Sequence, residues 1–381
     1  MQITSKLPAV GTTIFSVMSQ LAVEHKAVNL GQGFPDYEPP QALREAVARA
    51  MAQGANQYAL GIGLAGLRQA IARKTRRLYG HAVNPDTEVT VTSGATEAIF
   101  SAIAALVRQG DEVIVFDPAY DCYEPAIDLQ GARAVHIPLG QPTFAIDWQR
   151  VRDAITPRTR MILVNSPHNP SGAVLSADDL DTLAGLVRDT GIIVLSDEVY
   201  EHIVYDGAAH QSVLRHPELA ARSVVVSSFG KTYHCTGWKV GYAVAPAALS
   251  AEFRKVHQYV TFCTFHPAQV AFAEFMESHP EHYLELPAFY QAKRDRFREL
   301  LAPSRLKLLD VPGGYFQLVD YSAIRDEDDT AFCQWLVREG GVAAIPLSPF
   351  CAEPPGTRLA RLCFAKSDAT LEQAAERLVR L

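Results

Sequence analysis

Short, nearly all-apolar segments alternate with amphipathic segments along the middle of the 381-residue chain, and this alternation limits the possible folds most. Residues 88–93, 191–200 and 223–231 are apolar segments, and residues 95–110 and 175–191 are amphipathic ones. Strands that are apolar on both faces are typical of a parallel sheet covered by helices on each side. The alternation therefore predicts an α/β fold with a mostly parallel sheet flanked by helices.

The pattern changes after about residue 247 and becomes mainly helical. Farther along, residues 305–321 and 357–366 alternate as strands do and predict a small α+β domain. The first forty residues are rich in Gly and Pro and predict an irregular arm with little regular structure. We expect three parts: an arm that also joins the small domain (1–45), a large α/β domain (46–285) and a small C-terminal domain (286–381).

Composition and charge exclude several classes of protein. Hydrophobic residues make up 48% of the chain, charged residues 20%, and the formal net charge is −7. No basic cluster accompanies that charge, so we expect no nucleic-acid partner. No apolar run approaches the ~20 residues of a membrane span, and the first residues do not resemble a signal peptide. The six cysteines are scattered without a CxxC pair, which favours reduced thiols in a cytoplasm over disulfides or zinc.

Short polar residues end the predicted strands. They are Ser93, Asp117, Asn165, Asp197 and Ser228. Such residues often only cap helices or begin turns. However, ligands of open parallel sheets bind beyond the carboxyl ends of the strands. Because all five strand ends share this feature and a lysine follows the last, we expect a ligand site there.

That lysine is Lys231, in the segment SFGKTYHCTGWKVGY. A lysine here could be an ordinary surface charge. A nearby cation and partial desolvation lower the pKa of a lysine, and the neutral amine can form a Schiff base. Lys239 and Ser228, in the same segment, could instead bind a phosphate group. The helix that begins near Ala95, in SGATEA, offers free N–H groups that also attract a phosphate.

Asp197 ends the apolar segment GIIVLSDEVY. It could cap a helix or form a surface ion pair, but a carboxylate at this place could also hold a protonated pyridine nitrogen, as in a pyridoxal cofactor. Tyr200, farther along the same segment, could reach the phenolic oxygen of that cofactor. Asn169, in the loop NSPHNPSG, could reach the same oxygen, and the alternative is an ordinary turn.

Four motifs follow one another along the chain: SGATEA, NSPHNPSG, SDEVY and SSFGKTYHCTGWKVGY. In this order they resemble the fold-type I pyridoxal-phosphate aminotransferases of class I/II, and the resemblance covers essentially the whole chain. Within that family, GQGFPD, NQYA, DPAYDCYEP and RLCFAK are most similar to methionine aminotransferases and the related kynurenine–oxoglutarate aminotransferases. The resemblance implies pyridoxal 5′-phosphate as cofactor and a homodimer with shared active sites.

The resemblance also implies roles for the matching residues. Lys231 would carry the cofactor and act as the catalytic residue, and Asp197 would pair with the pyridine nitrogen. Asn169 and Tyr200 would hydrogen-bond the phenolic oxygen, and Tyr120 would stack on the ring. Five further residues would hold the phosphate: Ala95 and Thr96 through their backbone, Ser228, Lys239 and, from the neighbouring subunit, Tyr58. Many relatives have arginine where this chain has Lys239, which keeps the charge but loses the bidentate geometry.

Arg361, in LARLCFAK, matches the arginine that binds the substrate α-carboxylate, a group that suits a planar guanidinium. Taken alone, it would more often be a surface arginine. Asn169 and the backbone at Gly33 would bind at the same carboxylate. Aromatic residues are candidates for an apolar side-chain pocket: Phe15, Phe34, Tyr120, Tyr123 and Phe262.

Two other motifs lack the context that their functions require. GIGLAG, residues 61–66, has the GxGxxG spacing, but no strand pattern precedes it, as a dinucleotide site would need. Gly230-Lys231-Thr232 is similar to the end of a P-loop, but Val225 stands where the first glycine belongs. The histidines show no paired ligand spacing, so we expect no metal site.

These features predict a cytoplasmic pyridoxal-phosphate-dependent aminotransferase that acts on amino acids and 2-oxo acids by a ping-pong mechanism. The family placement favours methionine and aromatic or other apolar amino acids as donors. The alternative is a kynurenine–oxoglutarate aminotransferase with cysteine-conjugate β-lyase activity. A different class, a cofactor-binding sensor without catalysis, would need an added DNA-binding region, for which the residues before GQGFPD leave no room. The preferred donor and acceptor stay open.

Overall fold

The computed structural model describes residues 3–381, and a seven-stranded sheet forms the centre of that part of the chain. Six of the strands run parallel, and β8 is antiparallel to both of its neighbours, β2 and β7. The mostly parallel sheet predicted from the sequence is confirmed. In spatial order the strands are β2 (Val89–Thr92), β8 (Gly241–Val244), β7 (Ser223–Ser228), β6 (Ile193–Asp197), β5 (Thr159–Asn165), β3 (Glu112–Asp117) and β4 (Arg133–Pro138).

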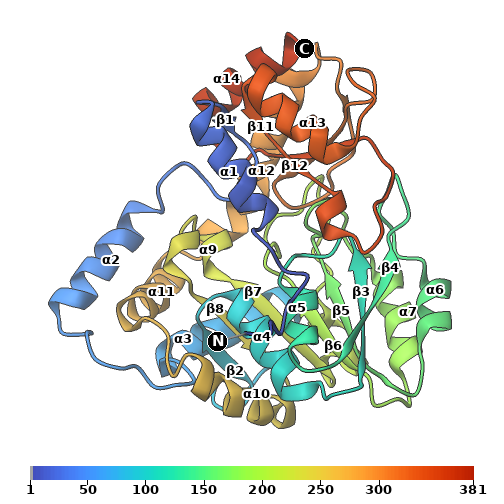
Figure 1. The fold of residues 1–381 in the computed structure, drawn as a ribbon. Helices are drawn as coiled ribbons and strands as arrows, with labels where there is room; N and C mark the ends of the chain where they lie inside the picture. Colours follow the sequence, from blue (N-terminus) through green and yellow to red (C-terminus); the bar gives the residue numbers. More distant parts are fainter. Residues whose placement is uncertain (1–2) are drawn as a thin grey trace.

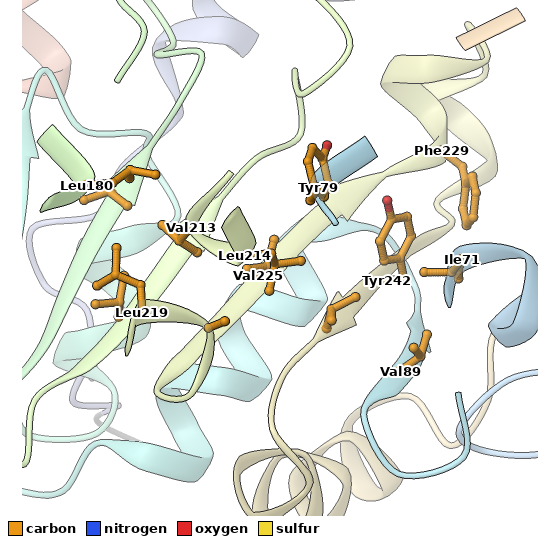
Figure 2. Packing of buried hydrophobic residues seen from close by; sticks show 14 of the residues in the cluster. Ile71, Tyr79, Val89, Leu180, Val213, Leu214, Leu219, Val225, Phe229 and Tyr242 are labelled. Carbon is orange, nitrogen blue, oxygen red and sulfur yellow. The ribbon is translucent and has the colours of Figure 1, made fainter. Parts of the chain in front are cut away.

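Helices cover both faces of this sheet (Figure 1). Successive strand residues enter opposite hydrophobic cores, as Val113 and Ile114 do, because strand side chains alternate between the faces. One core includes residues of α4 (Ala95–Leu106), α5 (Tyr123–Asp128) and α10 (Ala247–Val260). The other includes residues of α2 (Gln41–Ala52), α3 (Ala65–Tyr79), α6 (Trp148–Ala154), α7 (Ala177–Val187) and α11 (His266–Ser278). Figure 2 shows part of this second core, where Ile71, Val225 and Tyr242 pack together.

A second, smaller unit contains an antiparallel sheet in the order β12-β13-β10-β9. Its strands and helices are β9 (Lys307–Leu308), β10 (Phe316–Asp320), β12 (Ile345–Pro346), β13 (Leu359–Cys363), α12 (Glu281–Leu301), α13 (Asp329–Trp335) and α14 (Asp368–Val379). The predicted small α+β unit is therefore confirmed. In addition, β1 (Val28–Asn29) pairs with β11 (Val342–Ala343), so part of the N-terminal arm joins this unit. The exact domain limits stay a prediction.

The prediction of an irregular N-terminal arm was wrong for one segment. Residues Ile14–Glu24 form helix α1, whose first turn is capped by the Thr13 side chain. Met18 and Ala22 are buried one turn apart, which gives the helix an apolar side against the small unit. The Gly and Pro residues on either side of this segment hid its helical period.

A capping box at Ser176, the N-cap residue, fixes the first turn of helix α7. Among residues 3–381, no helix combines the length and the apolar character needed to cross a bilayer. All six cysteines are free thiols in the described chain.

Candidate active site

A cavity of about 310 Å³ lies at the carboxyl ends of β5, β6 and β7 and beside the start of α4. The small unit closes it with Phe316 and Arg361, and the N-terminal arm adds Phe15 and Phe34. The tertiary structure brings together all the predicted site residues except Tyr58. Those that line the cavity are Gly33, Ala95, Thr96, Tyr120, Asn169, Asp197, Tyr200, Ser228, Lys231, Lys239 and Arg361.

The start of helix α4 forms one end of the cavity. Gly94 has a φ of 84°, and no side chain caps the helix, so its first N–H groups face the cavity. Lys239 Nζ lies beside Gly94, at 3.4 Å from the place where a Cβ on that residue would stand, which is an ordinary contact distance. A Cβ at Gly241 would lie 2.6 Å from Ser227 O and 3.1 Å from Ala95 N, so this glycine allows strand β8 to approach the helix start closely. Free N–H groups beside an ammonium favour an anion at this end.

Asp197 lies at the floor of the cavity. Tyr123 donates to its Oδ2 at 2.6 Å, and the Val199 N–H donates to its Oδ1 at 3.2 Å. Burial raises the pKa of Asp197 to about 6, although both hydrogen bonds oppose that change. A cation in contact with this carboxylate would keep it ionised near neutral pH.

Lys231 lies in the wall of the cavity, at the end of the short helix α9 (Phe229–Thr232). Its Nζ donates to Gly33 O and to the Tyr315 hydroxyl oxygen, each at 3.0 Å. Burial lowers the pKa of Lys231 to about 8, and the charges of Arg361 and Lys239 contribute. A substantial fraction of the amine is therefore neutral near physiological pH, as a nucleophile or base requires.

Arg361 is buried among aromatic rings, with its guanidinium 4.0 Å from the centre of the Phe316 ring and 5.3 Å from that of Phe15. Its Nη1 donates to Asn169 Oδ1 at 2.8 Å, and its Nη2 donates to Gly31 O at 2.6 Å. Its buried Nε has no hydrogen-bond partner in the structure. Since both oxygens are uncharged, the guanidinium remains available for an anionic ligand.

The charges of the cavity do not balance. Lys231, Lys239 and Arg361 line it, and Asp197 is the one carboxylate among the described residues that do so. None of the three cations forms an ion pair with a described carboxylate; the polar contacts of Lys231 and Arg361 are to uncharged oxygens. An excess of unpaired positive charge in a closed space favours ligands that carry a phosphate or a carboxylate.

Tyr58 lies outside this cavity. Its side chain is 80% exposed and contacts the ring of Phe262, which is itself on the surface. Phe262 therefore does not line the pocket of its own chain, whereas the other four aromatic candidates do. Of the polar strand ends, Ser93 bonds Thr261 and Asp117 bonds His136, so neither reaches the cavity.

The segment with the GxGxxG spacing, residues 61–66, has a structural role. Residues 61–64 form a loop that leads into α3, which begins at Ala65, and no strand lies directly before that loop. In that loop, a Cβ at Gly63 would overlap the side chain of Val91, so the glycine serves close packing. Among the described residues, no cluster of three potential metal ligands occurs.

Sequence reasoning missed two contributors to the site. Asn165 was noted only as a strand end, yet its side chain accepts from the Asn169 N–H and donates to Asp197 O, each at 2.9 Å. It therefore holds two of the predicted residues in place. Tyr315 was not singled out at all, and the only local signal was the Gly-Gly-Tyr-Phe turn before β10.

Comparisons with known proteins agree with this site. The model of the family described as aminotransferase class I and II matches residues 25–378. A methionine aminotransferase from Escherichia coli (strain K12) is 56% identical over 377 residues, which cover 99% of this chain and 98% of that protein. Kynurenine–oxoglutarate transaminase 3 from Mus musculus is 34% identical over 401 residues, covering 97% and 88% of the two chains.

A solved structure gives the same result in three dimensions. It comes from Escherichia coli and is described as identifying a methionine aminotransferase function. The TM-score is 0.98 at 55% sequence identity, and each chain is covered over 100% of its length. The family resemblance stated from the sequence motifs is therefore confirmed.

Proposed function

Because the chain belongs to the class I and II aminotransferases, we propose that it moves the amino group of methionine, or of another apolar or aromatic amino acid, to a 2-oxo acid with pyridoxal 5′-phosphate as cofactor. One observation carries the cofactor assignment. Three unpaired cations and one buried carboxylate line the same cavity. A phosphate, a pyridinium nitrogen and a substrate carboxylate would each find a partner of opposite charge there.

The cofactor would be held at both ends. The free N–H groups of Ala95 and Thr96, the Ser228 hydroxyl and the Lys239 ammonium would bind the phosphate. Asp197 would keep the pyridine nitrogen protonated, and its two hydrogen bonds fix the carboxylate for that task. The remaining contacts would come from the ring-facing residues Asn169, Tyr200 and Tyr120.

The reacting groups of the chain follow from the same geometry. Arg361 would bind the substrate α-carboxylate, beside Asn169 and the Gly33 backbone. When bound, pyridoxal phosphate withdraws the electron pair that is left when the substrate Cα loses its proton. Lys231 would carry the cofactor covalently until the substrate amine displaces it. Its freed Nζ would then take the proton from Cα as a general base and deliver it to C4′ of the bound cofactor as a general acid. Two such half-reactions give ping-pong kinetics.

The side-chain end of the site favours apolar donors. Phe15 and Phe316 line the cavity beside Arg361, and Phe34 lines the same cavity. Among the described lining residues, the cations are those already assigned to the phosphate, the cofactor and the α-carboxylate. No further cation is left for an acidic side chain, so aspartate and glutamate would bury an unpaired charge. Methionine and aromatic amino acids would bury apolar surface instead.

We also propose that the enzyme is a homodimer. Large apolar side chains are exposed in two segments, residues 58–60 and 259–265, which meet where the ring of Tyr58 contacts that of Phe262. Within these segments the most exposed are Tyr259 (89%) and Tyr58 (80%). Leu60, Phe262 and Phe265 belong to the same exposed group. Large exposed apolar surfaces often mark protein interfaces. A second copy of the chain would cover these residues and would place Tyr58 at the phosphate of the neighbouring active site.

The other expected partners are the amino acid and 2-oxo acid substrates, and we expect neither nucleic acid nor a membrane as a partner. A cytoplasmic location stays a prediction.

A donor and acceptor panel tests the substrate assignment. Methionine, phenylalanine, tyrosine, kynurenine, aspartate and glutamate are each combined with several 2-oxo acids, and the new oxo acids are measured. We expect kcat/KM for the apolar donors to exceed that for aspartate by about 100-fold. Activity confined to aspartate and glutamate would overturn the apolar-pocket assignment. Preference for kynurenine, or pyruvate released from a cysteine conjugate without an acceptor, would favour the alternative activity.

The Lys231→Ala variant tests the mechanism. Transfer should fall by at least about 10⁴-fold, because the proton carrier and the covalent attachment are both removed. Lys255→Ala is a suitable control, since Lys255 is exposed and pairs only with Glu252. A Lys231→Ala protein with normal transfer would remove this lysine from its assigned role.

A further inference from the structure

The amine of Lys231 is held by two oxygen atoms that come from distant parts of the chain. Gly33 O belongs to the arm after β1, and the Tyr315 hydroxyl lies directly before β10 of the small unit. Each is 3.0 Å from Lys231 Nζ. The two oxygens are also bonded to each other, because Tyr315 donates to Gly33 O at 2.6 Å. The three groups therefore form a closed triangle.

The number of available protons determines which group donates each hydrogen bond of this triangle. A phenol has one proton, and Tyr315 uses it for Gly33 O. Burial raises the pKa of Tyr315 well above its usual value, so the hydroxyl keeps that proton. The phenolic oxygen is then free to accept a hydrogen bond from Lys231 Nζ. Both oxygens thus act as acceptors toward the amine and stabilise its protonated form more than its neutral form.

The backbone at Gly33 is adapted to this contact. A Cβ at that position would lie 2.9 Å from Cζ of Phe316, which is closer than side-chain packing allows. Only glycine lets the carbonyl approach Tyr315 and Lys231 while the Phe316 ring stays in place. Tyr315 itself is fully buried, and edge-on contacts with the rings of Tyr200 and Phe316 fix its orientation.

We propose that Tyr315 is a positioning residue that, together with Gly33 O, holds the Lys231 amine while that amine carries the substrate proton. This inference rests on the proposed aminotransferase function and adds to it a residue from the small unit. A free lysine side chain has many rotamers, and two acceptors at 3.0 Å restrict it to one place in the cavity. An amine that is already held in one place needs less rearrangement before it can take the proton from the substrate Cα.

Other titratable groups also face the amine and must be kept constant in any test. They are Asp197 from β6, Lys239 from the segment before β8, and Arg361 and Cys363 from β13. The rings of Tyr200 and Tyr315 lie with their centres 5.6 Å from Nζ. A substitution that removes only one hydroxyl leaves all of these groups unchanged.

The first test reads the amine directly in cofactor-free protein. Tyr315→Phe removes the hydroxyl and keeps the ring. Acetylation of Lys231 is followed across pH by peptide mass spectrometry, and its apparent pKa should fall by about one unit relative to the wild type. Tyr290→Phe is the matched control, because Tyr290 is also buried but bonds Tyr37 instead. An unchanged titration in Tyr315→Phe, or an equal change in Tyr290→Phe, would overturn the proposal.

The second test uses the cofactor-loaded enzyme. In Tyr315→Phe, kcat should fall about tenfold while KM and the cofactor dissociation constant stay within about twofold. A rise in KM with constant kcat would contradict a positioning role. Tyr315→Met provides a second hydroxyl-free variant should Tyr315→Phe fold poorly, and it should show the same loss of kcat. If the wild type transfers no amino group, the proposed function fails, whereas the titration of Lys231 still decides whether Tyr315 holds the amine.

Discussion

Lys74 and Lys231 are two of the lysines that are withdrawn from solvent, and their surroundings differ in one respect. Lys74, on α3, is buried with its Nζ 2.6 Å from Glu201 Oε1. Lys231 lies partly buried in the cavity wall and contacts only uncharged oxygens. Burial lowers the pKa of both lysines, but the Glu201 charge opposes that effect at Lys74. One lysine is therefore half of an ion pair, and the other is a reactive amine.

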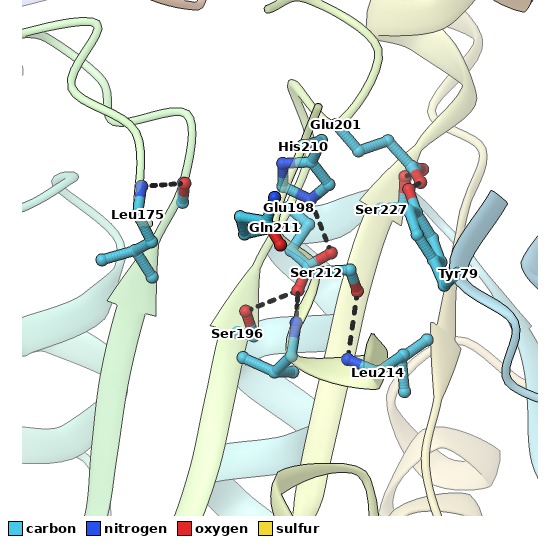
Figure 3. Close-up of polar contacts among 12 residues, drawn as sticks. Tyr79, Leu175, Ser196, Glu198, Glu201, His210, Gln211, Ser212, Leu214 and Ser227 are labelled. Atoms are coloured by element: carbon cyan, nitrogen blue, oxygen red, sulfur yellow. Dashed lines mark hydrogen bonds and ion pairs between the residues drawn. The ribbon is translucent and has the colours of Figure 1, made fainter. Parts of the chain in front are cut away.

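The polar network around Glu201 explains why Lys74 is not reactive. Glu201 accepts hydrogen bonds from Tyr79, Ser227 and Tyr242 in addition to Lys74, and Figure 3 shows the first two of these contacts. Although burial raises it, the pKa of Glu201 is held well below its usual range by the Lys74 ammonium. The charges of Lys74 and Glu201 neutralise each other without a ligand. The unpaired cations of the cavity, in contrast, need an anionic ligand to be neutralised.

The largest expected effect is a difference in the free energy of unfolding between variants of Lys74 and variants of Lys231. Lys74→Met should lower the free energy of unfolding by about 3–5 kcal/mol, because it leaves the Glu201 charge buried without its partner. Lys231→Met should change the same quantity in cofactor-free protein by less than about 1 kcal/mol, since no carboxylate loses a partner. Urea unfolding of the cofactor-free variants measures both. Equal losses would show that the two lysines do not differ as described.

A double variant sharpens this result. Glu201→Gln keeps an oxygen acceptor for Ser227 and Tyr242, which both donate to Oε1, but removes the charge. In Lys74→Met/Glu201→Gln, much of the stability lost in Lys74→Met should return, because no uncompensated charge remains buried. Strictly additive losses would contradict the ion-pair explanation.

A smaller effect is expected at Arg361, another buried cation without a carboxylate partner among residues 3–381. Arg361→Met should raise KM for the amino donor about 100-fold, equivalent to about 2.7 kcal/mol of charged hydrogen bonding. Unfolding should be almost unaffected, in contrast to Lys74→Met. Arg358→Met is the control, because Arg358 pairs with exposed Asp326 outside the cavity. An unchanged KM in Arg361→Met would remove this residue from carboxylate binding.

The smallest effect concerns Asp197 and depends on pH. Its pKa is raised to about 6 in the folded, cofactor-free protein, so the ionised carboxylate destabilises the fold above that pH. Asp197→Asn should therefore stabilise the cofactor-free protein by about 2 kcal/mol at pH 8. The gain should disappear as the pH falls through about 6 toward 4, where the wild-type carboxyl is neutral as well. Melting curves across pH measure it, and a gain that grows on acidification would contradict the raised pKa.

Much of the fold and most of the site could be predicted from neighbouring residues in the chain. Apolar strands, the capped start of α7 and the polar strand ends are local patterns, and so is the motif that contains Lys231. The helix α1 was missed because flanking Gly and Pro residues outweighed its period of buried positions. Tyr315 was missed because an aromatic residue next to an apolar strand is normally part of a core.

The sequence by itself determined the order of the elements, the mostly parallel sheet and the family to which the chain belongs. Only the tertiary structure decided which buried charges have partners. Glu201 lies 127 residues from Lys74 along the chain, and Gly33 lies 198 residues from Lys231. The period of a helix or strand shows which side of an element is buried, but it contains no information about which distant side chain will lie opposite. That pairing makes Lys74 structural and leaves Lys231 available for chemistry.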